Sequence, residues 1–190
     1  MNVLGISYGY HDASASLVMD GRIVAAIAEE RLTRQKHDAN FPTYAIRACL
    51  AAGGIGQEDL DQVVFHEDPH TKFTRVITSS LAPFPHSRRE FVSSAKSWLG
   101  NKLWALGTIS SRLNLAPEKI TYVGHHMSHA AQAFMGSGFE RAGILIVDAV
   151  GDWSSTALYT GEWCDGRPRI ERVTEIAFPH SLGLVYSAIT

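Results

Sequence analysis

The chain has 190 residues, of which 45% are hydrophobic and 19% charged, and its formal net charge is −2 at pH 7. These values are typical of an ordinary globular domain, and the small net charge gives no electrostatic reason to expect nucleic acid or a membrane surface as a partner. The two cysteines are too few for a disulfide framework, the amino terminus lacks the pattern of a signal peptide, and no apolar run reaches the ~20 residues needed to span a bilayer. The sequence therefore predicts a cytoplasmic protein.

The opening of the chain predicts a meander of three strands. These strands are expected over residues 3–6, 15–19 and 22–29. The first turn is broad and carries Gly9, His11 and Asp12, whereas Asp20-Gly21 is a strong signal for a tight hairpin. The third strand is apolar on both faces, so we expect both to be covered. This opening resembles the ribonuclease-H-like half-domain of actin, sugar kinases and heat-shock chaperones, an α/β fold with a mixed sheet in which the first broad turn touches phosphate.

The middle of the chain predicts a helix, a strand, an insertion and a long helix. A helix is expected over residues 43–52, because Pro42 suits its start and Gly53-Gly54 its end. The other expected elements are a solvated charged connection over residues 29–36, a strand over 63–65, an irregular surface insertion over 66–86, one amphipathic helix over 91–113 with Lys102 among its basic residues, and a strand over 120–123.

A histidine pair and an aspartate follow. His125 and His129 are four residues apart, so on a helix they lie on one face and can grip one metal ion. Residues 144–147 are wholly apolar and predict a central buried strand, after which Asp148 stands where the strand leaves the core. Two imidazoles and one carboxylate suit Fe(II), Mn(II) or Zn(II). Three alternatives stay open: a chance HxxxH, His126 as the ligand or facing solvent, and Asp148 as a strand-end cap.

The last part predicts a hairpin over residues 154–159 and 169–176 with its turn at 164–166, and then a helix beginning near residue 178. That helix stops without a C-cap signal, so we expect the chain to be the amino-terminal piece of a longer protein.

Several blocks carry a resemblance to a known family. VLGISYGYHDASASLVMDGRIVAAIAEERLTRQKH, HHMSHAAQAF, LIVDAVGDWSSTALY and SLGLVYSAIT stand here in the order found in the O-carbamoyltransferase family of nodulation protein U and the cephalosporin and tobramycin carbamoyltransferases. The similarity covers nearly the whole chain and is weakest over residues 66–115. Ala149 and Asp152 depart from the glycine and glutamate common in the family.

The resemblance implies a two-part enzyme. A YrdC-like part, expected downstream, makes carbamoyl adenylate from ATP and carbamoyl phosphate, and the metal-binding part, to which residues 1–190 belong with an insertion over 66–115, passes the carbamoyl group to a hydroxyl. The implied acceptor is a small molecule such as a sugar or an antibiotic, and the implied metal is Fe(II). We expect residues 1–190 alone to be inactive; homo-oligomerisation is left open.

The family match also assigns site residues. It places metal ligands at His125, His129 and Asp148, with a further ligand beyond residue 190, and matches His11 to the active-site histidine. An imidazole titrates near neutral pH, so His11 is the predicted general base; a hydrogen-bonded turn residue is the alternative.

Nucleotide or substrate contacts are predicted for Asp12 and Lys36 and, in a phosphate-facing turn, for Gly151 and Asp152. Solvent exposure is the alternative for Lys36, and a plain hairpin for the turn.

Two other functions compete with carbamoyl transfer. One is an ATPase or kinase of the actin-like superfamily, which would not need the histidine pair. The other is a non-catalytic metal-binding fragment.

Overall fold

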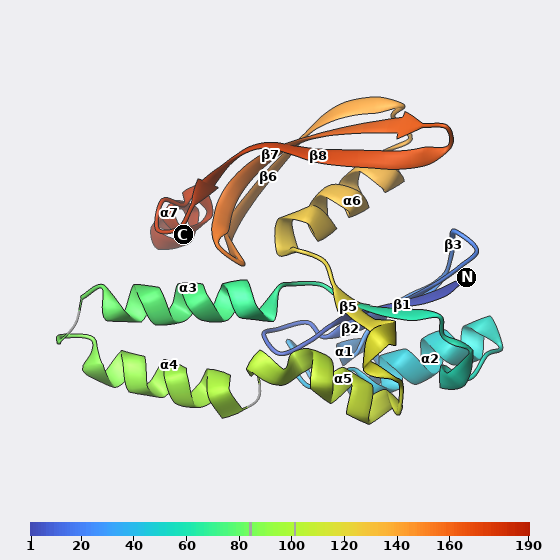
Figure 1. The fold of residues 1–190 in the computed structure, drawn as a ribbon, viewed down its shortest axis with the longest axis horizontal. Coiled ribbons are helices and arrows are strands. Elements are labelled where there is room, and N and C mark those ends of the chain that lie inside the picture. Colours follow the sequence, from blue (N-terminus) through green and yellow to red (C-terminus); the bar gives the residue numbers. More distant parts are fainter. Residues whose placement is uncertain (84, 101) are drawn as a thin grey trace. The chain divides into compact units, whose positions relative to one another are not determined.

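A computed structural model describes residues 1–83, 85–100 and 102–190, with the side chains of Glu90 and Lys102 outside that description (Figure 1). The predicted place of Lys102 on a helix surface therefore lies outside the described side chains. The chain divides into two compact units: Met1–His66 with Leu99–Tyr122, called unit 1, and Glu67–Trp98 with Val123–Thr190, called unit 2.

Unit 1 is built on a five-stranded mixed sheet. Its strands are β1 Asn2–Ser7, β2 Ser14–Met19, β3 Arg22–Ala28, β4 Gln62–Phe65 and β5 Ile120–Tyr122. Their order is β3-β2-β1-β4-β5, with β2 antiparallel to β1 and β3, and β4 parallel to β1 and β5. This is the strand order and direction of the ribonuclease-H-like fold, so the predicted fold class and the opening meander are confirmed.

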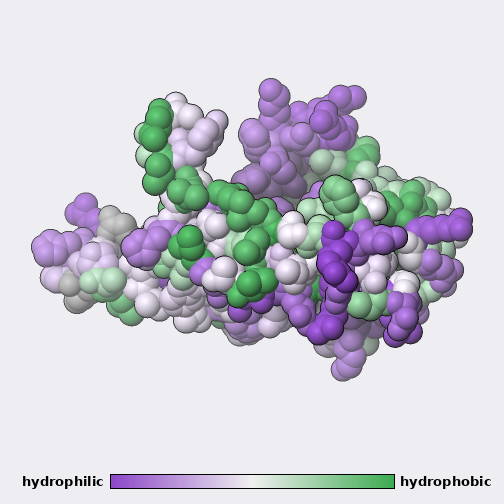
Figure 2. Space-filling model, turned by 90° about the horizontal axis from the view of Figure 1, so that it is seen from above, coloured by the Kyte–Doolittle hydropathy of each residue, from purple (hydrophilic) through white to green (hydrophobic). Residues whose placement is uncertain are grey.

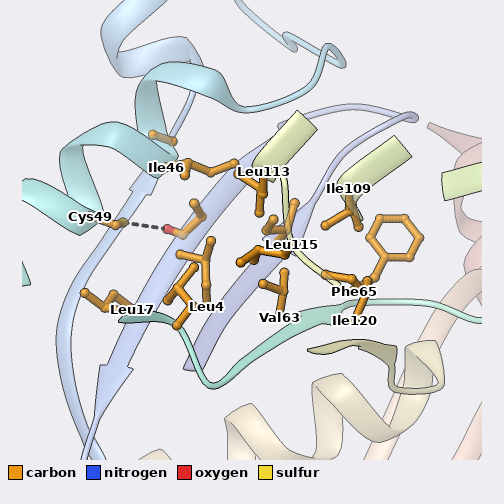
Figure 3. Packing of buried hydrophobic residues seen from close by; sticks show 14 of the residues in the cluster. Leu4, Leu17, Ile46, Cys49, Val63, Phe65, Ile109, Leu113, Leu115 and Ile120 are labelled. Atoms are coloured by element: carbon orange, nitrogen blue, oxygen red, sulfur yellow. Dashed lines mark hydrogen bonds between the residues drawn. The ribbon is translucent and has the colours of Figure 1, made fainter. Parts of the chain in front are cut away.

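Helices cover one face of this sheet (Figure 1). They are α2 Thr43–Gly53 and α5 Ala105–Leu113. The unit also contains the short helix α1 Glu30–Thr33, which buries no residue, and 3₁₀ turns at Gln57–Asp59, Lys102–Trp104 and Pro117–Lys119. Figure 3 shows side chains from α2, α5 and the strands interleaved in one apolar core, with Leu4, Leu17, Val63 and Ile109 fully buried. Burial of such side chains contributes about 1.5–3 kcal/mol each, which fixes the sheet as a platform for its turns.

Glu29 ties the charged connection to α2. Its carboxylate is 2% exposed and accepts hydrogen bonds from the backbone N–H groups of Tyr44 (3.0 Å) and Ala45 (2.7 Å), so it caps the first turn of the helix. The prediction of a solvated connection is therefore wrong at Glu29, because a carboxylate can be buried where it satisfies unpaired helix amides.

Three further predictions in unit 1 and the insertion are corrected. The third strand, β3, is an edge strand with Ile23 77% exposed, so it is not covered on both faces. The insertion holds a regular helix, α3 Pro69–Leu81, which Asp68 caps by accepting from His70 N at 2.9 Å. The single long helix is instead α4 Arg88–Gly100, the 3₁₀ turn and α5.

Unit 2 contains α3, most of α4, α6 His125–Ser137, α7 Leu182–Ile189 and a three-stranded antiparallel sheet. The strands are β6 Arg141–Gly151, β7 Ser154–Cys164 and β8 Arg167–Ala177, and the hairpin between the last two is confirmed. Helix α6 packs on the sheet through Ala130 and Phe134, which meet Ile144, Ile146 and Tyr159. The histidine helix is thus held by its own apolar face.

Two predictions about β6 are corrected. It is an edge strand, and its side chains alternate, with Ile144 and Ile146 buried but Leu145 66% and Val147 50% exposed. It also belongs to a different sheet from β5, whereas the order strand, helix, strand around the histidines predicts one βαβ-like unit with both strands in the same sheet.

Apolar side chains are exposed along α7. Leu182 (61%), Val185 (55%) and Ile189 (81%) are examples, and hydrophobic residues gather over this helix in Figure 2. None of the helices in the described ranges is both long enough and apolar enough to cross a membrane.

Candidate metal centre

Three donor atoms converge in unit 2, two from the first turns of α6 and one from β6. The Nε2 atoms of His125 and His129 are 3.1 Å apart, and His125 Nε2 lies 3.2 Å from Asp148 Oδ2. All three ligand atoms fall within 4.8 Å of one another. The predicted triad of His125, His129 and Asp148 is therefore brought together.

These spacings suit a metal ion. Donors about 2.0–2.1 Å from a common ion lie about 2.8–3.0 Å apart as neighbours in octahedral geometry and about 3.3–3.4 Å apart in tetrahedral geometry, an interval of about 2.8–3.4 Å. The separations of 3.1 Å and 3.2 Å fall in that interval. Asp148 Oδ2 is buried and makes no hydrogen bond to any described atom. A buried carboxylate oxygen facing imidazole nitrogens fits a site for a divalent cation.

The shape of β6 explains how Asp148 reaches the histidines. Pairing of β6 with β7 runs through Val147, lapses, and resumes only at Gly151. Asp148 is the first residue outside the ladder, and its Oδ1 accepts from Ala149 N at 2.6 Å, which leaves Oδ2 directed at the imidazoles. The expected position of Asp148 at a strand end is therefore the start of a bulge.

Helix α7 secures the bulge from the other side. The single hydroxyl proton of Ser181 lies within hydrogen-bond reach of the carbonyls of Asp148 (Oγ–O 3.1 Å) and Ala149 (2.7 Å), which share it, and Oγ accepts from Leu184 N (3.1 Å). A Cβ at Gly183 would lie 2.5 Å from the Asp148 carbonyl, so only glycine permits this approach. The bulge carbonyls are thus satisfied without a ladder partner.

The charges of the cluster are set by its neighbours. His125 first, and then His126, hold the pKa of Asp148 well below its usual range. Burial, and then the adjacent His125, lower the pKa of His129. An ionised carboxylate and neutral imidazoles are the forms that bind metals.

Glu67 lies on the Nδ1 side of the His125 ring, away from the other two candidate ligands. It is 8% exposed, its Oε2 is 4.0 Å from His125 Nδ1, and Lys72 Nζ is 2.5 Å from the same oxygen. Carboxylates near the second nitrogen of a ligating histidine orient the ring. Sequence reasoning missed Glu67, because no local pattern joins it to a helix that begins at residue 125.

His126 is buried, with 4% of its surface exposed, so the alternative that it faces solvent is wrong. Its Nε2 is 3.7 Å from Asp148 Oδ2. Gly151 lies against both neighbouring rings: a Cβ there would be 2.4 Å from His125 Cδ2 and 2.8 Å from His126 Cδ2. Gly151 therefore packs closely against the rings of His125 and His126.

Asp152 joins two helix starts. Its carboxylate accepts from His125 N (2.8 Å) and from Asp68 N (3.1 Å), and its backbone carbonyl accepts from Arg75 Nε (2.5 Å). Burial raises the pKa of this carboxyl group. Both oxygens of Asp152 are thus engaged by backbone amides; contact with a nucleotide stays a prediction for Asp152 and Gly151.

The other predicted residues lie in unit 1. His11 and Asp12 are exposed in the broad turn between β1 and β2, and His11 Nδ1 is 2.7 Å from Asp12 Oδ2. Hydrogen bonds from His11 and then His37 hold the pKa of Asp12 below its usual value. Lys36 is exposed. His37, which the sequence did not single out, is 3.1 Å from Asp12 Oδ1.

The fold is that of a ribonuclease-H-like α/β protein, and it brings two histidines and one carboxylate together in a cluster that could hold a metal ion. The chain belongs to the family described as carbamoyltransferase N-terminus, because the model of that family matches residues 2–190. The family resemblance seen in the sequence is confirmed.

Curated relatives agree with this assignment. An uncharacterized protein of Synechocystis sp. is 43% identical over 198 residues, covering 100% of this chain and 31% of that protein. Nodulation protein NolNO of Sinorhizobium fredii is 34% identical over 182 residues, covering 93% of this chain and 24% of that protein. The chain thus spans about a third or less of the length of these relatives.

Among solved structures, YeaZ from Pseudomonas aeruginosa is similar, with 16% identity, a TM-score of 0.47, and coverage of 94% of this chain and 67% of that chain. The fold assignment rests on strand order and direction, not on this score.

Proposed function

We propose that the protein transfers a carbamoyl group from carbamoyl adenylate, made from ATP and carbamoyl phosphate, to a hydroxyl of a small-molecule acceptor. Membership of the carbamoyltransferase family supports carbamoyl transfer in general. The observation that carries the finer proposal is the convergence of His125 Nε2, His129 Nε2 and Asp148 Oδ2.

These three residues would hold one divalent ion, for which Fe(II) is our proposal, since imidazole and carboxylate ligands suit it. When bound, such an ion supplies Lewis acidity that polarises an oxygen of the carbamoyl or phosphate group. Glu67 would keep the His125 ring in place, because it faces the nitrogen that is turned away from the other ligands.

His11 would take the proton of the acceptor hydroxyl. Its Nδ1 is engaged by Asp12, so Nε2 is the nitrogen available as a base. A positioned general base contributes about 10²–10⁴-fold to a rate. Lys36, exposed in the loop that precedes α2, would contact the phosphate groups of the substrate through its ammonium.

The test uses the purified full-length protein with ATP, carbamoyl phosphate, and tobramycin or free sugars as trial acceptors. Carbamoyl adenylate and carbamoylated product are followed separately by mass spectrometry in the wild type, in His11→Ala and in His70→Ala. His70 is an exposed histidine of α3 and serves as the control.

We expect His11→Ala to lower product formation at least about 100-fold while adenylate formation and the control stay at wild-type level. Equal loss of adenylate and product in His11→Ala would remove His11 from the transfer step. Phosphorylation of a sugar without carbamoyl phosphate would favour a kinase instead. Metal binding without any turnover would favour a non-catalytic role.

A further inference from the structure

The loop that carries His37 is fastened to the broad turn that carries His11. Gly9 N donates to Ala39 O at 2.9 Å, and Ala13 N donates to Asp38 O at 2.7 Å. These backbone hydrogen bonds lie on either side of His11 and Asp12. Two segments about 25 residues apart in the sequence are therefore held in register, as strands of a sheet would be.

Hydrogen bonds from residues of α1 and from the loop itself also hold the loop that carries His37. Asp38 is 6% exposed, and its carboxylate accepts from Thr33 Oγ1 (3.0 Å) and from Asn40 N (3.0 Å). The backbone N–H of His37 donates to Glu30 Oε2 at 3.0 Å. His37 is thus fixed at its own backbone and at the next residue, which limits the positions open to its imidazole.

Asp12 bridges two imidazoles. His11 Nδ1 is 2.7 Å from one carboxylate oxygen, and His37 Nδ1 is 3.1 Å from the other. Asp12 and His37 both have left-handed backbone conformations, with φ of 51° and 56°. Such conformations cost side chains other than glycine about 1 kcal/mol or more and persist only where the surroundings impose them.

The bridge decides which nitrogen of His11 carries the proton. A carboxylate accepts hydrogen bonds, so the Nδ1 atom of each ring is the donor and Nε2 keeps its lone pair in the neutral form. The carboxylate could turn about its bond to Cβ if only His11 held it. Because His37 holds the second oxygen, the carboxylate plane is fixed, and with it the direction of the His11 ring.

We propose that His37 is a positioning residue that acts through Asp12 to hold His11 as a general base with Nε2 directed outward. Asp12 accordingly supports His11, with both of its oxygens already engaged. The inference rests on the proposed role of His11 in carbamoyl transfer, and it adds a residue that acts on His11 through the Asp12 carboxylate.

Two matched variants of the full-length protein test the proposal. In His37→Asn, the side-chain amide keeps an N–H donor where Nδ1 stands. In His37→Asp, a carboxylate of the same shape faces Asp12 and repels it. Both residues tolerate a left-handed backbone, so strain at φ 56° is matched between them. His70→Asp, on an exposed position of α3, controls for the added charge.

The first readout is steady-state transfer to tobramycin or sugar acceptors. We expect His37→Asn to stay within about twofold of the wild type. We expect His37→Asp to lose about 10–100-fold in kcat with little change in KM, the effect usual for a lost orienting partner. Unfolding temperatures of the two variants should agree.

The second readout does not need activity. Diethyl pyrocarbonate modifies an imidazole nitrogen, and mass spectrometry of the His11 peptide at one fixed pH gives the time course of its modification, called here the modification profile. His37→Asp should change the rate of this modification about twofold or more, because a repelled Asp12 no longer holds the His11 ring in one direction, and His37→Asn should leave the rate unchanged.

The two readouts separate the possible failures. Absence of carbamoyl transfer in the wild type would refute the proposed function, while the modification profile would still show whether His37 acts on His11. Transfer in the wild type with equal rates in His37→Asn and His37→Asp, or equal modification profiles, would overturn the role of His37.

Discussion

Gly151→Ala should disturb the proposed metal centre without replacing any of its three proposed ligands. The added Cβ would lie 2.4 Å from His125 Cδ2 and 2.8 Å from both His125 Cγ and His126 Cδ2. Relieving the shortest contact to an ordinary 3.4 Å requires a movement of about 1 Å. His126 is buried and the first residue of α6 is hydrogen bonded to Asp152, so the rings have little room to yield.

The expected losses of metal affinity and of stability follow from that displacement. Metal–ligand distances tolerate only about 0.2 Å, so a shift of about 1 Å in His125 should lower metal affinity roughly 10–100-fold. Overpacking should also lower the free energy of unfolding by about 1–3 kcal/mol. Neither loss requires a change in the identity of any donor atom.

The assay titrates metal-free full-length protein with Co(II), following the ligand-field absorption, and records thermal unfolding of the same samples. Gly136→Ala is the matched control: it lies in α6 as well, and an added Cβ meets nothing within 4 Å. Since alanine is the better helix former by about 1 kcal/mol, the control should be slightly stabilised. Wild-type affinity and stability in Gly151→Ala would refute the packing argument.

Two further predictions concern buried polar groups. Asp152→Asn should lower the free energy of unfolding by about 1–3 kcal/mol in a urea titration, because an amide cannot accept with both ends from the His125 and Asp68 amides; an unchanged midpoint would contradict this. Burial raises the pKa of Tyr8 to about 12, against 10.0 in an unfolded chain, so stability present below pH 10 should be lost as the pH rises to about 12. Because the side chain is only partly buried and solvent screens the effect, we expect the loss to be about 1 kcal/mol. Tyr8→Phe should remove this loss of stability when unfolding is measured over that pH range. If the stability of Tyr8→Phe fell with pH as steeply as that of the wild type, the prediction would be wrong.

The parts of the fold that could be predicted have local causes. Asp20-Gly21 forms the tight turn, with φ of 49° and 77°, and α2 ends at Gly54 with φ 64°. These residues specify their conformations through their own backbone preferences. The prediction of one long helix over residues 91–113 was wrong because apolar residues keep spacings of three and four on both sides of the 3₁₀ turn. Such spacing does not reveal a change from an α-helix to a 3₁₀ turn.

The candidate site likewise has features with a local cause, which the sequence predicts, and features that depend on residues distant in the sequence. The spacing of His125 and His129 sufficed to place both rings on one turn of a helix, and it predicted the cluster. The capping of α6 by Asp152 and the placing of His37 on Asp12 depend on partners 27 and 25 residues away. Contacts of that kind depend on the packed fold, so no local pattern predicted them.

The most direct test of the account is the metal content of the full-length protein, purified without oxygen and measured by inductively coupled plasma mass spectrometry. Wild type and the control His70→Ala should carry one divalent ion per chain. His125→Ala, His129→Ala and Asp148→Ala should each lose most of it, because the three donors that lie within 4.8 Å of one another form one site. Undiminished metal in all three variants would contradict the central claim.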